Sequence, residues 1–373
     1  MPELADIFRR YGRQYREKYA DGILPSHLRA MRDIENCRTE SMGGHLYRCE
    51  NHACGQFVYS YHSCKNRHCP KCQNDQAEIW LNKQQDKLLP VQHFLVTATL
   101  PAELRSLARS NQKTVYNILF KTSAEAILKL ARDPRFIGGE IGMTGVLHTW
   151  DKTCGYHPHI HYLVPAGGLS PDHSEWRAAR RHNFLIRVEL ISAIFKAKFR
   201  DELKKAGLFD LVPDEVWKKN WVVHCEPVGS GREAAIYLAR YVFRVAISNN
   251  RIVSIDNDQI TFRCLDAKTR QWYLKTLPAL DFIHHFLQHV LPKSFQKVRY
   301  YGLFAHTNRN LLEVARYILG APLPSPEPAK TENAHPQLCC PKCNGALRLV
   351  EKIPRPGRGP PHSATSRSLP YYC

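Results

Sequence analysis

The sequence lacks features that would place it in several common protein classes. No apolar run reaches the roughly 20 residues needed to span a bilayer, which argues against a membrane-spanning protein. Residues 1–19 are mixed and charged and do not resemble a signal peptide, so we expect a soluble, intracellular protein. Because thiols stay reduced inside cells, the 13 cysteines are expected to be metal ligands or buried thiols, not disulfides.

Acidic residues are scarce relative to basic ones. Asp and Glu number 34 against 53 Lys and Arg, which gives a formal net charge of +19. Such a surplus points to a polyanionic partner, most commonly nucleic acid, although a basic cytosolic protein of another kind carries the same signature. The 373 residues are enough for two or three domains, and the hydrophobic fraction of 43% is ordinary for a globular chain.

The pattern of apolar residues predicts a mixed α+β chain without internal repeats. Runs of β-branched or alternating residues predict strands at 93–101, 142–150, 157–168 and 221–228, and a hairpin at 251–264. Helical spacing predicts two helices within 3–35 and further helices at 74–88, 102–131, 184–205, 232–245 and 278–291. Residues 322–328 are proline-rich and predict a linker, and the tail beyond Gly345 is expected to be mobile. This alternation favours an α+β core sheet.

Three histidines alternate along the predicted strand at 157–168. His157, His159 and His161 share one face, because side chains of a strand alternate between its two faces. His159 and His161 are the best pair for one divalent ion, because Ile160 between them is a better buried strand residue than Pro158. The alternative is a surface row of histidines that binds no metal.

Two tyrosines lie four residues apart on the predicted helix at 232–245. Tyr237 and Tyr241 therefore share one helical face, with Arg240 and Arg244 on the neighbouring one. A tyrosine can attack a phosphodiester and retain the 5′ phosphate as a covalent ester. A metal held by two histidines would orient that phosphate and stabilise its charge. The alternative is that both tyrosines simply pack the helix against the core.

The cysteines gather near both ends of the chain. Cys49 and Cys54 form one pair and Cys69 and Cys72 a second, and together they predict a tetrahedral structural zinc site. Other potential ligands are interspersed, and they offer a second zinc site or alternative ligands for the first: Cys37, His45, Cys64 and His68. Cys340 and Cys343 look like half of another zinc knuckle with no partner pair, which Cys339 and Cys373 are the available residues to complete.

Basic and aromatic residues surround these cysteines. Lys65, Arg67 and Lys71 could contact phosphate, and nearby rings could stack on bases: Tyr59, Tyr61 and His62. Solvated charge is the competing interpretation of the three basic residues. Arg299 follows a basic stretch and is a further candidate for DNA contact, although Tyr300 and Tyr301 beside it could equally be a packed aromatic pair.

Four motifs together resemble a known family. They are HSCKNRHCPKCQ (62–73), HPHIHYLV (157–164), YLARYVFR (237–244) and VRYYGLFA (298–305). Their order is similar to that of the two-tyrosine rolling-circle transposases of the HUH endonuclease superfamily, which carry an N-terminal zinc-binding domain. The resemblance covers the chain from about Cys37 to Ala305.

The resemblance implies a fold, an activity and roles for individual residues. It implies a ferredoxin-like sheet with the two-histidine motif on a central strand, and nicking and transfer of single-stranded DNA through a 5′-phosphotyrosine link. His159 and His161 would bind catalytic Mg²⁺ or Mn²⁺, and Tyr237 and Tyr241 would be the nucleophiles. The third ligand would be Asp151 or His148, and Asp151 is preferred because hard cations favour oxygen. The protein would act on single-stranded element ends in the bacterial cytoplasm, associated with the nucleoid.

The same resemblance divides the chain into three parts. Residues 1–90 would hold the N-terminal helices and a zinc-binding, DNA-binding domain, residues 91–320 the nuclease, and residues 321–373 a linker with a zinc knuckle or a mobile tail. Two alternatives stay open. A plasmid replication initiator or relaxase would use the same chemistry, and a zinc-dependent DNA-binding protein would use none.

Overall fold

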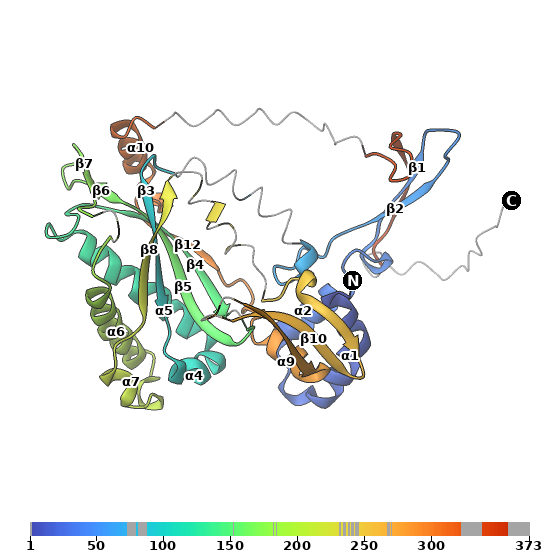
Figure 1. Ribbon diagram of the computed structural model, residues 1–373, viewed down its shortest axis with the longest axis horizontal. Helices are drawn as coiled ribbons and strands as arrows, with labels where there is room; N and C mark the ends of the chain where they lie inside the picture. The colour runs from blue at the N-terminus through green and yellow to red at the C-terminus, as the bar shows by residue number, and fades with distance from the viewer. Residues whose placement is uncertain are drawn as a thin grey trace.

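The computed structural model describes most of the chain (Figure 1). The described residues are 2–72, 80, 88–151, 153–181, 183, 185–230, 233, 236, 237, 239, 242, 246–266, 269, 271–321 and 338–356. They form a mixed α+β structure in which every described strand pairing is antiparallel. The expected α+β class is therefore confirmed.

The largest sheet has five strands in the order β12-β4-β5-β3-β8. Its strands are β3 (Gln92–Thr99), β4 (Gly142–Trp150), β5 (Tyr156–Pro165), β8 (Val223–Ser230) and β12 (Val298–Gly302). The four strands predicted in these regions are confirmed, whereas β12 was not expected as a strand. The histidine strand β5 lies in the middle of the sheet, so it is hydrogen-bonded on both sides.

Helices cover one face of this sheet (Figure 1). They are α4 (Arg105–Ser110), α5 (Gln112–Ala131) and α6 (Val188–Lys205). Ile160, Tyr162 and Val164 of β5 are buried in the core beneath them, as the alternation of the strand predicted. The Tyr162 hydroxyl donates to the Phe120 carbonyl oxygen at 3.1 Å, which satisfies a polar atom that would otherwise be costly to bury. The histidines therefore face the other side of the sheet.

A second core joins the N-terminus to a later part of the chain. Helices α1 (Leu4–Lys18) and α2 (Pro25–Glu35) pack with α9 (Ala279–Leu287) and with a second sheet of order β11-β10-β9. That sheet consists of β9 (Ile252–Asp256), β10 (Gln259–Leu265) and β11 (Trp272–Pro278). Phe8 and Phe286 meet edge to face at 5.5 Å in this core. The core thus combines residues from both sides of the boundary expected at residue 90.

Local sequence explains why these elements begin and turn where they do. Glu3 and Asp6 form a capping box at the start of α1, and Pro25 occupies the first turn of α2, where its missing N–H is not needed. The turn between β9 and β10 consists of Asn257 and Asp258, both with positive φ, as a two-residue hairpin requires. The predicted hairpin and the two N-terminal helices are therefore confirmed, and β11 adds an unexpected third strand.

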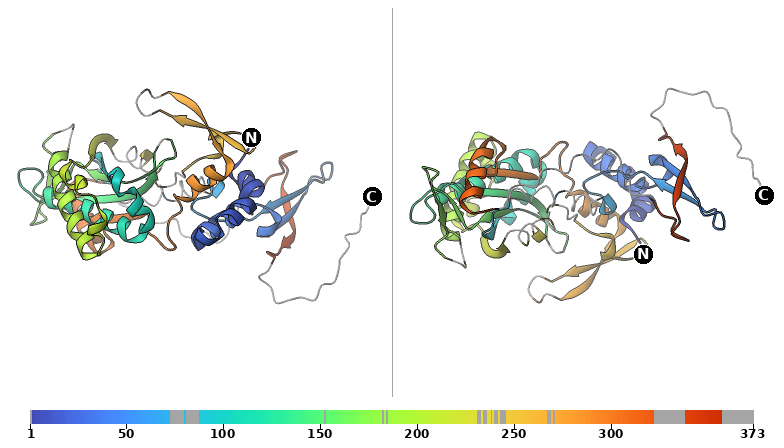
Figure 2. Two further views of the ribbon diagram at one scale, coloured as in Figure 1. Left: turned by 90° about the horizontal axis from the view of Figure 1, so that it is seen from below. Right: turned by 90° about the horizontal axis from the view of Figure 1, so that it is seen from above.

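A third sheet joins a hairpin from residues 44–61 to a strand from residues 347–353 (Figure 2). Its strands are β1 (Gly44–Cys49), β2 (Phe57–Tyr61) and β13 (Leu347–Ile353), in the order β13-β1-β2. The mobile tail expected beyond Gly345 was therefore wrong for residues 347–353, which form a strand. The tail residues pair with β1 because its edge offers unpaired backbone groups.

The remaining described elements are short or peripheral. They are β6 (Gly167–Leu169), β7 (Trp176–Ala178), α7 (Glu215–Lys218) and α10 (Arg309–Ile318), and the 3-10 helices Ala20–Gly22, Glu40–Met42, Ala102–Leu104, Phe209–Leu211, Asn249–Arg251 and His306–Asn308. The helix expected at 74–88 lies outside the described residues apart from Trp80 and Leu88, and the tyrosine helix is described only in part. Within the described portion of the chain, no helix combines the length and apolarity needed to cross a membrane.

Candidate functional site

Three histidines converge on the face of the large sheet opposite helices α5 and α6. His148 on β4 lies directly opposite His159 on β5, and His161 follows two residues later on the same face. One ring nitrogen of each of the three lies within 4.8 Å of the others. The three side chains are buried, with at most 9% of their surface exposed. Three imidazoles at this spacing could hold one metal ion and leave positions open for another ligand.

Hydrogen bonds orient two of these rings from behind. His159 Nδ1 donates to the carbonyl oxygen of His157 at 2.7 Å, which leaves the Nε2 lone pair free for a metal. His161 Nδ1 lies 2.9 Å from Thr97 Oγ1 on the neighbouring strand β3. Burial lowers the pKa of His159 to about 4, so its imidazole is neutral at physiological pH, as a metal ligand must be.

The expected third ligand, Asp151, has a different role. Its Oδ1 accepts hydrogen bonds from Thr153 N at 2.8 Å, Thr153 Oγ1 at 2.7 Å and Gly155 N at 2.9 Å. These contacts shape the turn between β4 and β5, and Asp151 is absent from the histidine cluster. The structure therefore places His148, the alternative that the sequence also offered, beside the other two histidines, and Asp151 outside that group. The sequence preference rested on oxygen chemistry, whereas strand register determines which side chain is near.

Tyr237 lies on the same side of the sheet as the histidines. Its hydroxyl donates to Glu226 Oε1 at 3.2 Å, and Glu226 Oε2 lies 3.4 Å from His224 Nε2. His224 is opposite Thr97 across β8 and β3, and Thr97 is opposite His161 across β3 and β5, so all three project from one face.

The described part of the tyrosine helix also makes an apolar contact with this face. Val242 packs against Val146 and Leu163, which flank the histidines on β4 and β5. Tyr241, Arg240 and Arg244 lie outside the described residues. Glu226 and His224 were missed in the sequence, where only the alternation of β8 and its pairing with β3 could have indicated them.

One cysteine cluster lies beside the N-terminal helices. It consists of Cys37, Cys64, Cys69 and Cys72, with Sγ–Sγ distances of 3.5 Å for Cys37–Cys72 and 3.6 Å for Cys64–Cys72. Zinc–sulfur bonds of about 2.3 Å in a tetrahedron place sulfurs about 3.8 Å apart, so the four thiols fit a zinc ion.

A second cluster joins both ends of the chain. Cys49 and Cys54 gather with Cys340 and Cys343, and not with Cys69 and Cys72 as the sequence predicted. The partner pair that the C-terminal knuckle lacked in sequence is thus Cys49 and Cys54. The physical reason is that the β1–β2 hairpin carries these residues to its end, where strand β13 arrives.

The other proposed zinc ligands lie elsewhere. His68 Nε2 accepts a hydrogen bond from Leu291 N at 3.3 Å, and the His45 ring packs edge-on against His62 at 5.0 Å. Neither belongs to a described cysteine cluster. Cys339 is exposed and outside the second cluster, and Cys373 lies outside the described residues.

Several basic residues expected at DNA make contacts within the chain. Arg67 donates to the carbonyl oxygens of Phe295 at 2.5 Å and Pro292 at 2.9 Å, so it fastens the cysteine segment to the chain that precedes β12. Lys71 forms an ion pair with Glu3 at 2.5 Å. Lys65 is exposed.

Arg299 lies on the helix-covered face of the large sheet. Its guanidinium lies 4.2 Å from the centre of the Phe120 ring and donates to Asn117 Oδ1 at 2.5 Å. Arg67 and Arg299 are thus both engaged in contacts within the chain. Tyr59 and Tyr61, in contrast, stack with ring centres 5.9 Å apart on β2, and Tyr59 is 58% exposed.

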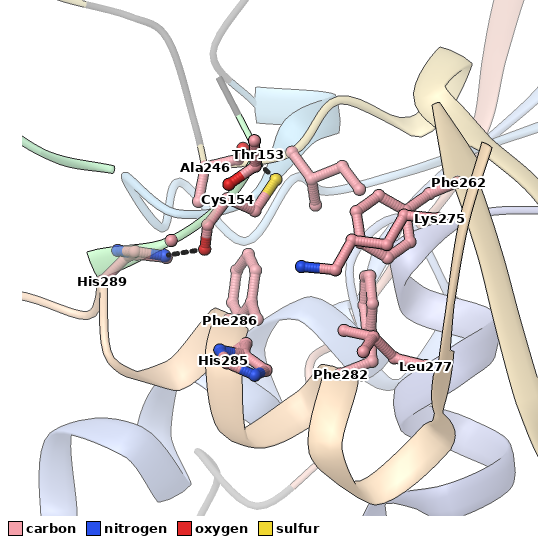
Figure 3. A pocket seen from close by; sticks show the side chains of 12 residues that line it. Thr153, Cys154, Ala246, Phe262, Lys275, Leu277, Phe282, His285, Phe286 and His289 are labelled. Carbon is pink, nitrogen blue, oxygen red and sulfur yellow. Dashed lines mark hydrogen bonds between the residues drawn. The ribbon is translucent and has the colours of Figure 1, made fainter. Parts of the chain in front are cut away.

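An apolar pocket lies behind the turn that leads into β5 (Figure 3). Phe262, Phe282 and Phe286 form its walls, and the Lys275 amine points into it. His289 Nε2 donates to the Cys154 carbonyl oxygen at 3.1 Å and so ties the turn to the segment after α9.

Comparison with known proteins gives consistent matches. Residues 142–311 match a family model described as "Putative transposase", and residues 7–100 match one described as "Transposase zinc-binding domain". The chain is 36% identical over 392 residues to "Putative transposase y4qJ" of Sinorhizobium fredii (strain NBRC 101917 / NGR234), which covers 96% of this chain and 97% of that protein.

A second relative is more distant. The chain is 27% identical over 300 residues to "Transposase for insertion sequence element IS801" of Pseudomonas savastanoi pv. phaseolicola, which covers 74% of this chain and 72% of that protein. No solved structure matches the chain. The "Putative transposase" match, residues 142–311, includes all three clustered histidines. The zinc-binding match, residues 7–100, includes the whole first cysteine cluster. The zinc-binding match and the cysteine geometry together support a structural zinc.

Proposed function

Because the chain belongs to the transposase family, we propose that it moves an insertion sequence by a rolling-circle route, as an HUH endonuclease with a tyrosine nucleophile. It would nick one DNA strand, hold the cut end covalently and pass it to a target. The observation that carries this proposal is that the three-histidine cluster projects from one face of the large sheet, and that Tyr237, on a helical segment, contacts Glu226 on that same face.

The histidine cluster is suited to hold the catalytic metal. His148, His159 and His161 would bind Mn²⁺ or Mg²⁺, and the nitrogen-only donor set favours Mn²⁺ of the two. A bound ion would supply charge stabilisation at the oxygens of the scissile phosphate. Thr97 and the His157 carbonyl would keep the rings oriented for that task.

Tyr237 would be the nucleophile of the first cleavage. Its hydroxyl proton passes to Glu226, which already accepts a hydrogen bond from it, and the phenolate oxygen bonds to phosphorus. The bond from phosphorus to the 3′ oxygen breaks, and that oxygen leaves as a hydroxyl after taking a proton. The 5′ phosphate then stays on the tyrosine. Tyr241 would serve the second cleavage.

Single-stranded DNA would reach this face from the zinc module. Exposed Tyr59 and its neighbour Tyr61 provide flat rings for base stacking, and exposed Lys65 provides charge for a phosphate. Arg240 and Arg244 remain candidates for contacts nearer the nucleophile. A replication initiator or relaxase would share the nicking chemistry, but both relatives are described as transposases.

The proposal is tested by trapping the covalent intermediate. A single-stranded oligonucleotide from the element's end, labelled at its 3′ end, is incubated with the protein and Mn²⁺, and the products are separated on a denaturing protein gel. We expect label on the wild-type protein, and none with EDTA or in Tyr237→Phe. Tyr317→Phe is the matched control, because Tyr317 is 88% exposed on α10, and it should behave as wild type.

One outcome would refute the proposal. If no adduct forms with either metal while the protein still binds the oligonucleotide, the nuclease assignment fails, and a zinc-bearing DNA-binding protein becomes the better account.

A further inference from the structure

The two ends of the described chain meet at one group of thiols. Cys49 and Cys343 are 294 residues apart in sequence, yet their sulfurs lie 3.4 Å apart. Next to them, strand β13 pairs with β1 from Gly44 opposite Ile353 to Cys49 opposite Leu347 (Figures 1 and 2). We propose that Cys49, Cys54, Cys340 and Cys343 bind a second structural zinc ion, which fastens the C-terminal segment to the N-terminal zinc module.

The sulfur positions fit a tetrahedral metal and not a pair of disulfides. Cys54 and Cys340 lie 3.9 Å apart, Cys49 and Cys343 lie 3.4 Å apart, and all four sulfurs are within 4.8 Å of one another. A zinc–tetrathiolate site requires separations of about 3.8 Å, whereas a disulfide requires about 2.05 Å. All four cysteines are free thiols.

The backbone around each pair is folded as a metal-binding knuckle. Cys54 N and Gly55 N both donate to the Asn51 carbonyl oxygen at 2.9 Å, and Asn344 N donates to the Cys340 carbonyl oxygen at 2.8 Å. Each pair of cysteines is thus held by a short hydrogen-bonded turn.

A shared backbone conformation relates the two clusters. The residue that follows Cys54 is Gly55 with φ +55°, and the residue that follows Cys343 is Asn344 with φ +58°. In the first cluster, Arg38 and Lys65 follow cysteines and have φ values of +56° and +53°. Residues with side chains rarely adopt this left-handed region, so its recurrence after cysteines indicates a common structural purpose. The second cluster thus has the local geometry of the first.

Burial alone cannot hold β13 in place. Its five central residues, 348–352, are exposed, including Leu349 at 43% and Val350 at 49%. A strand that adds backbone hydrogen bonds but buries little apolar surface is marginally stable in water. A metal ion shared between the two knuckles supplies the missing attachment. The cysteines that complete it lie beyond residues 7–100, the range that matches a zinc-binding domain.

The stoichiometry of zinc tests this inference directly. The full-length protein is purified without chelator, and its zinc is measured by mass spectrometry of the metal against protein concentration. We expect two zinc ions per chain in the wild type and one in the double variant Cys340→Ser, Cys343→Ser. Cys339→Ser is the matched control, since Cys339 is exposed and outside the cluster, and it should keep both ions.

A second measurement follows strand β13 itself. Hydrogen exchange of residues 347–353 should be slow in the wild type and fast in the double variant, while residues 4–18 of α1 stay protected in both. One zinc ion per wild-type chain, two retained in the double variant, or both lost from it would each overturn the proposal. The test does not depend on nuclease activity, so it stands or falls separately from the proposed transposase mechanism.

Discussion

The histidine centre and the cysteine clusters gather their ligands in different ways. Each cysteine cluster has four thiols, and a short turn supplies two of them: Cys69–Cys72 in one cluster and Cys340–Cys343 in the other. The histidine centre has three imidazoles, placed by the register of β4 against β5. Four ligands close a tetrahedral shell, whereas three leave room for a phosphate oxygen. The comparison shows two differences between a site suited to stabilise the fold and a site suited to catalysis: the number of ligands, and whether turns or paired strands position them.

The largest effect is expected from removing the histidine ligands. In the double variant His159→Ala, His161→Ala we expect nicking to fall by about 10³-fold or more, because the metal's charge stabilisation is lost. Zinc content should not change. Initial rates of oligonucleotide cleavage in Mn²⁺, together with metal analysis, measure both quantities.

His157→Ala is the matched control for this pair. It removes a ring from the same face but keeps the carbonyl oxygen that accepts the His159 hydrogen bond. We expect cleavage within about tenfold of wild type, because no metal ligand is lost. Equal losses in the control and the double variant would remove the distinction between ligand and neighbour.

A buried histidine outside the clusters gives an effect of intermediate size. Burial lowers the pKa of His93 to about 4, and its Nε2 has no hydrogen-bond partner in the described structure. Between about pH 6.5 and 4 the unfolded chain binds this proton and the folded chain does not, so stability falls as the pH drops through that range. When the pH is lowered from 7 to 4.5, the unfolding free energy of both proteins should decrease. The decrease in His93→Met should be smaller than that in the wild type by about 2–3 kcal/mol.

Urea denaturation at the two pH values provides this comparison. Identical losses in His93→Met and wild type would show that His93 has the same pKa in the folded and the unfolded chain, and that burial does not lower it.

The smallest effect concerns the basic residues. Lys65→Ala should weaken binding of single-stranded DNA by a few fold and reduce the magnitude of the salt slope by about 0.7, because one phosphate contact is lost. Arg299→Ala should leave that slope unchanged and instead lower the thermal stability, because Arg299 packs against Phe120. Fluorescence anisotropy measures the affinity for single-stranded DNA between about 50 and 200 mM salt, where phosphate contacts change the affinity strongly. The salt slopes of the two variants can then be compared. A loss of slope in Arg299→Ala alone would reverse their assignments.

The sequence predicted those parts of the sites that depend on local geometry. Strand alternation placed His159 and His161 on one face, and the Cys69–Cys72 spacing predicted a knuckle. It also predicted the outlines of β3, β4, β5 and β8, because buried strands carry a strong apolar signal.

Contacts between distant segments could not be obtained in the same way. The choice of His148 over Asp151 depends on which strand lies beside β5, and the pairing of Cys49 and Cys54 with the C-terminal knuckle depends on where β13 docks. The contact between Tyr237 and Glu226 depends likewise on how the tyrosine helix lies over β8. Single-sequence patterns record periodicity and spacing, but not the order of strands in a sheet.

The most direct test of the central claim is to locate the DNA–protein bond. The covalent adduct is digested with a nuclease and with trypsin, and the modified peptide is identified by mass spectrometry. Trypsin cuts after Arg232, Arg240 and Arg244, so Tyr237 and Tyr241 fall in separate peptides, 233–240 and 241–244. We predict a nucleotide phosphate on Tyr237 after first cleavage. A phosphate on Tyr241 alone would contradict the assignment of Tyr237, and a modification on neither peptide would contradict the tyrosine mechanism.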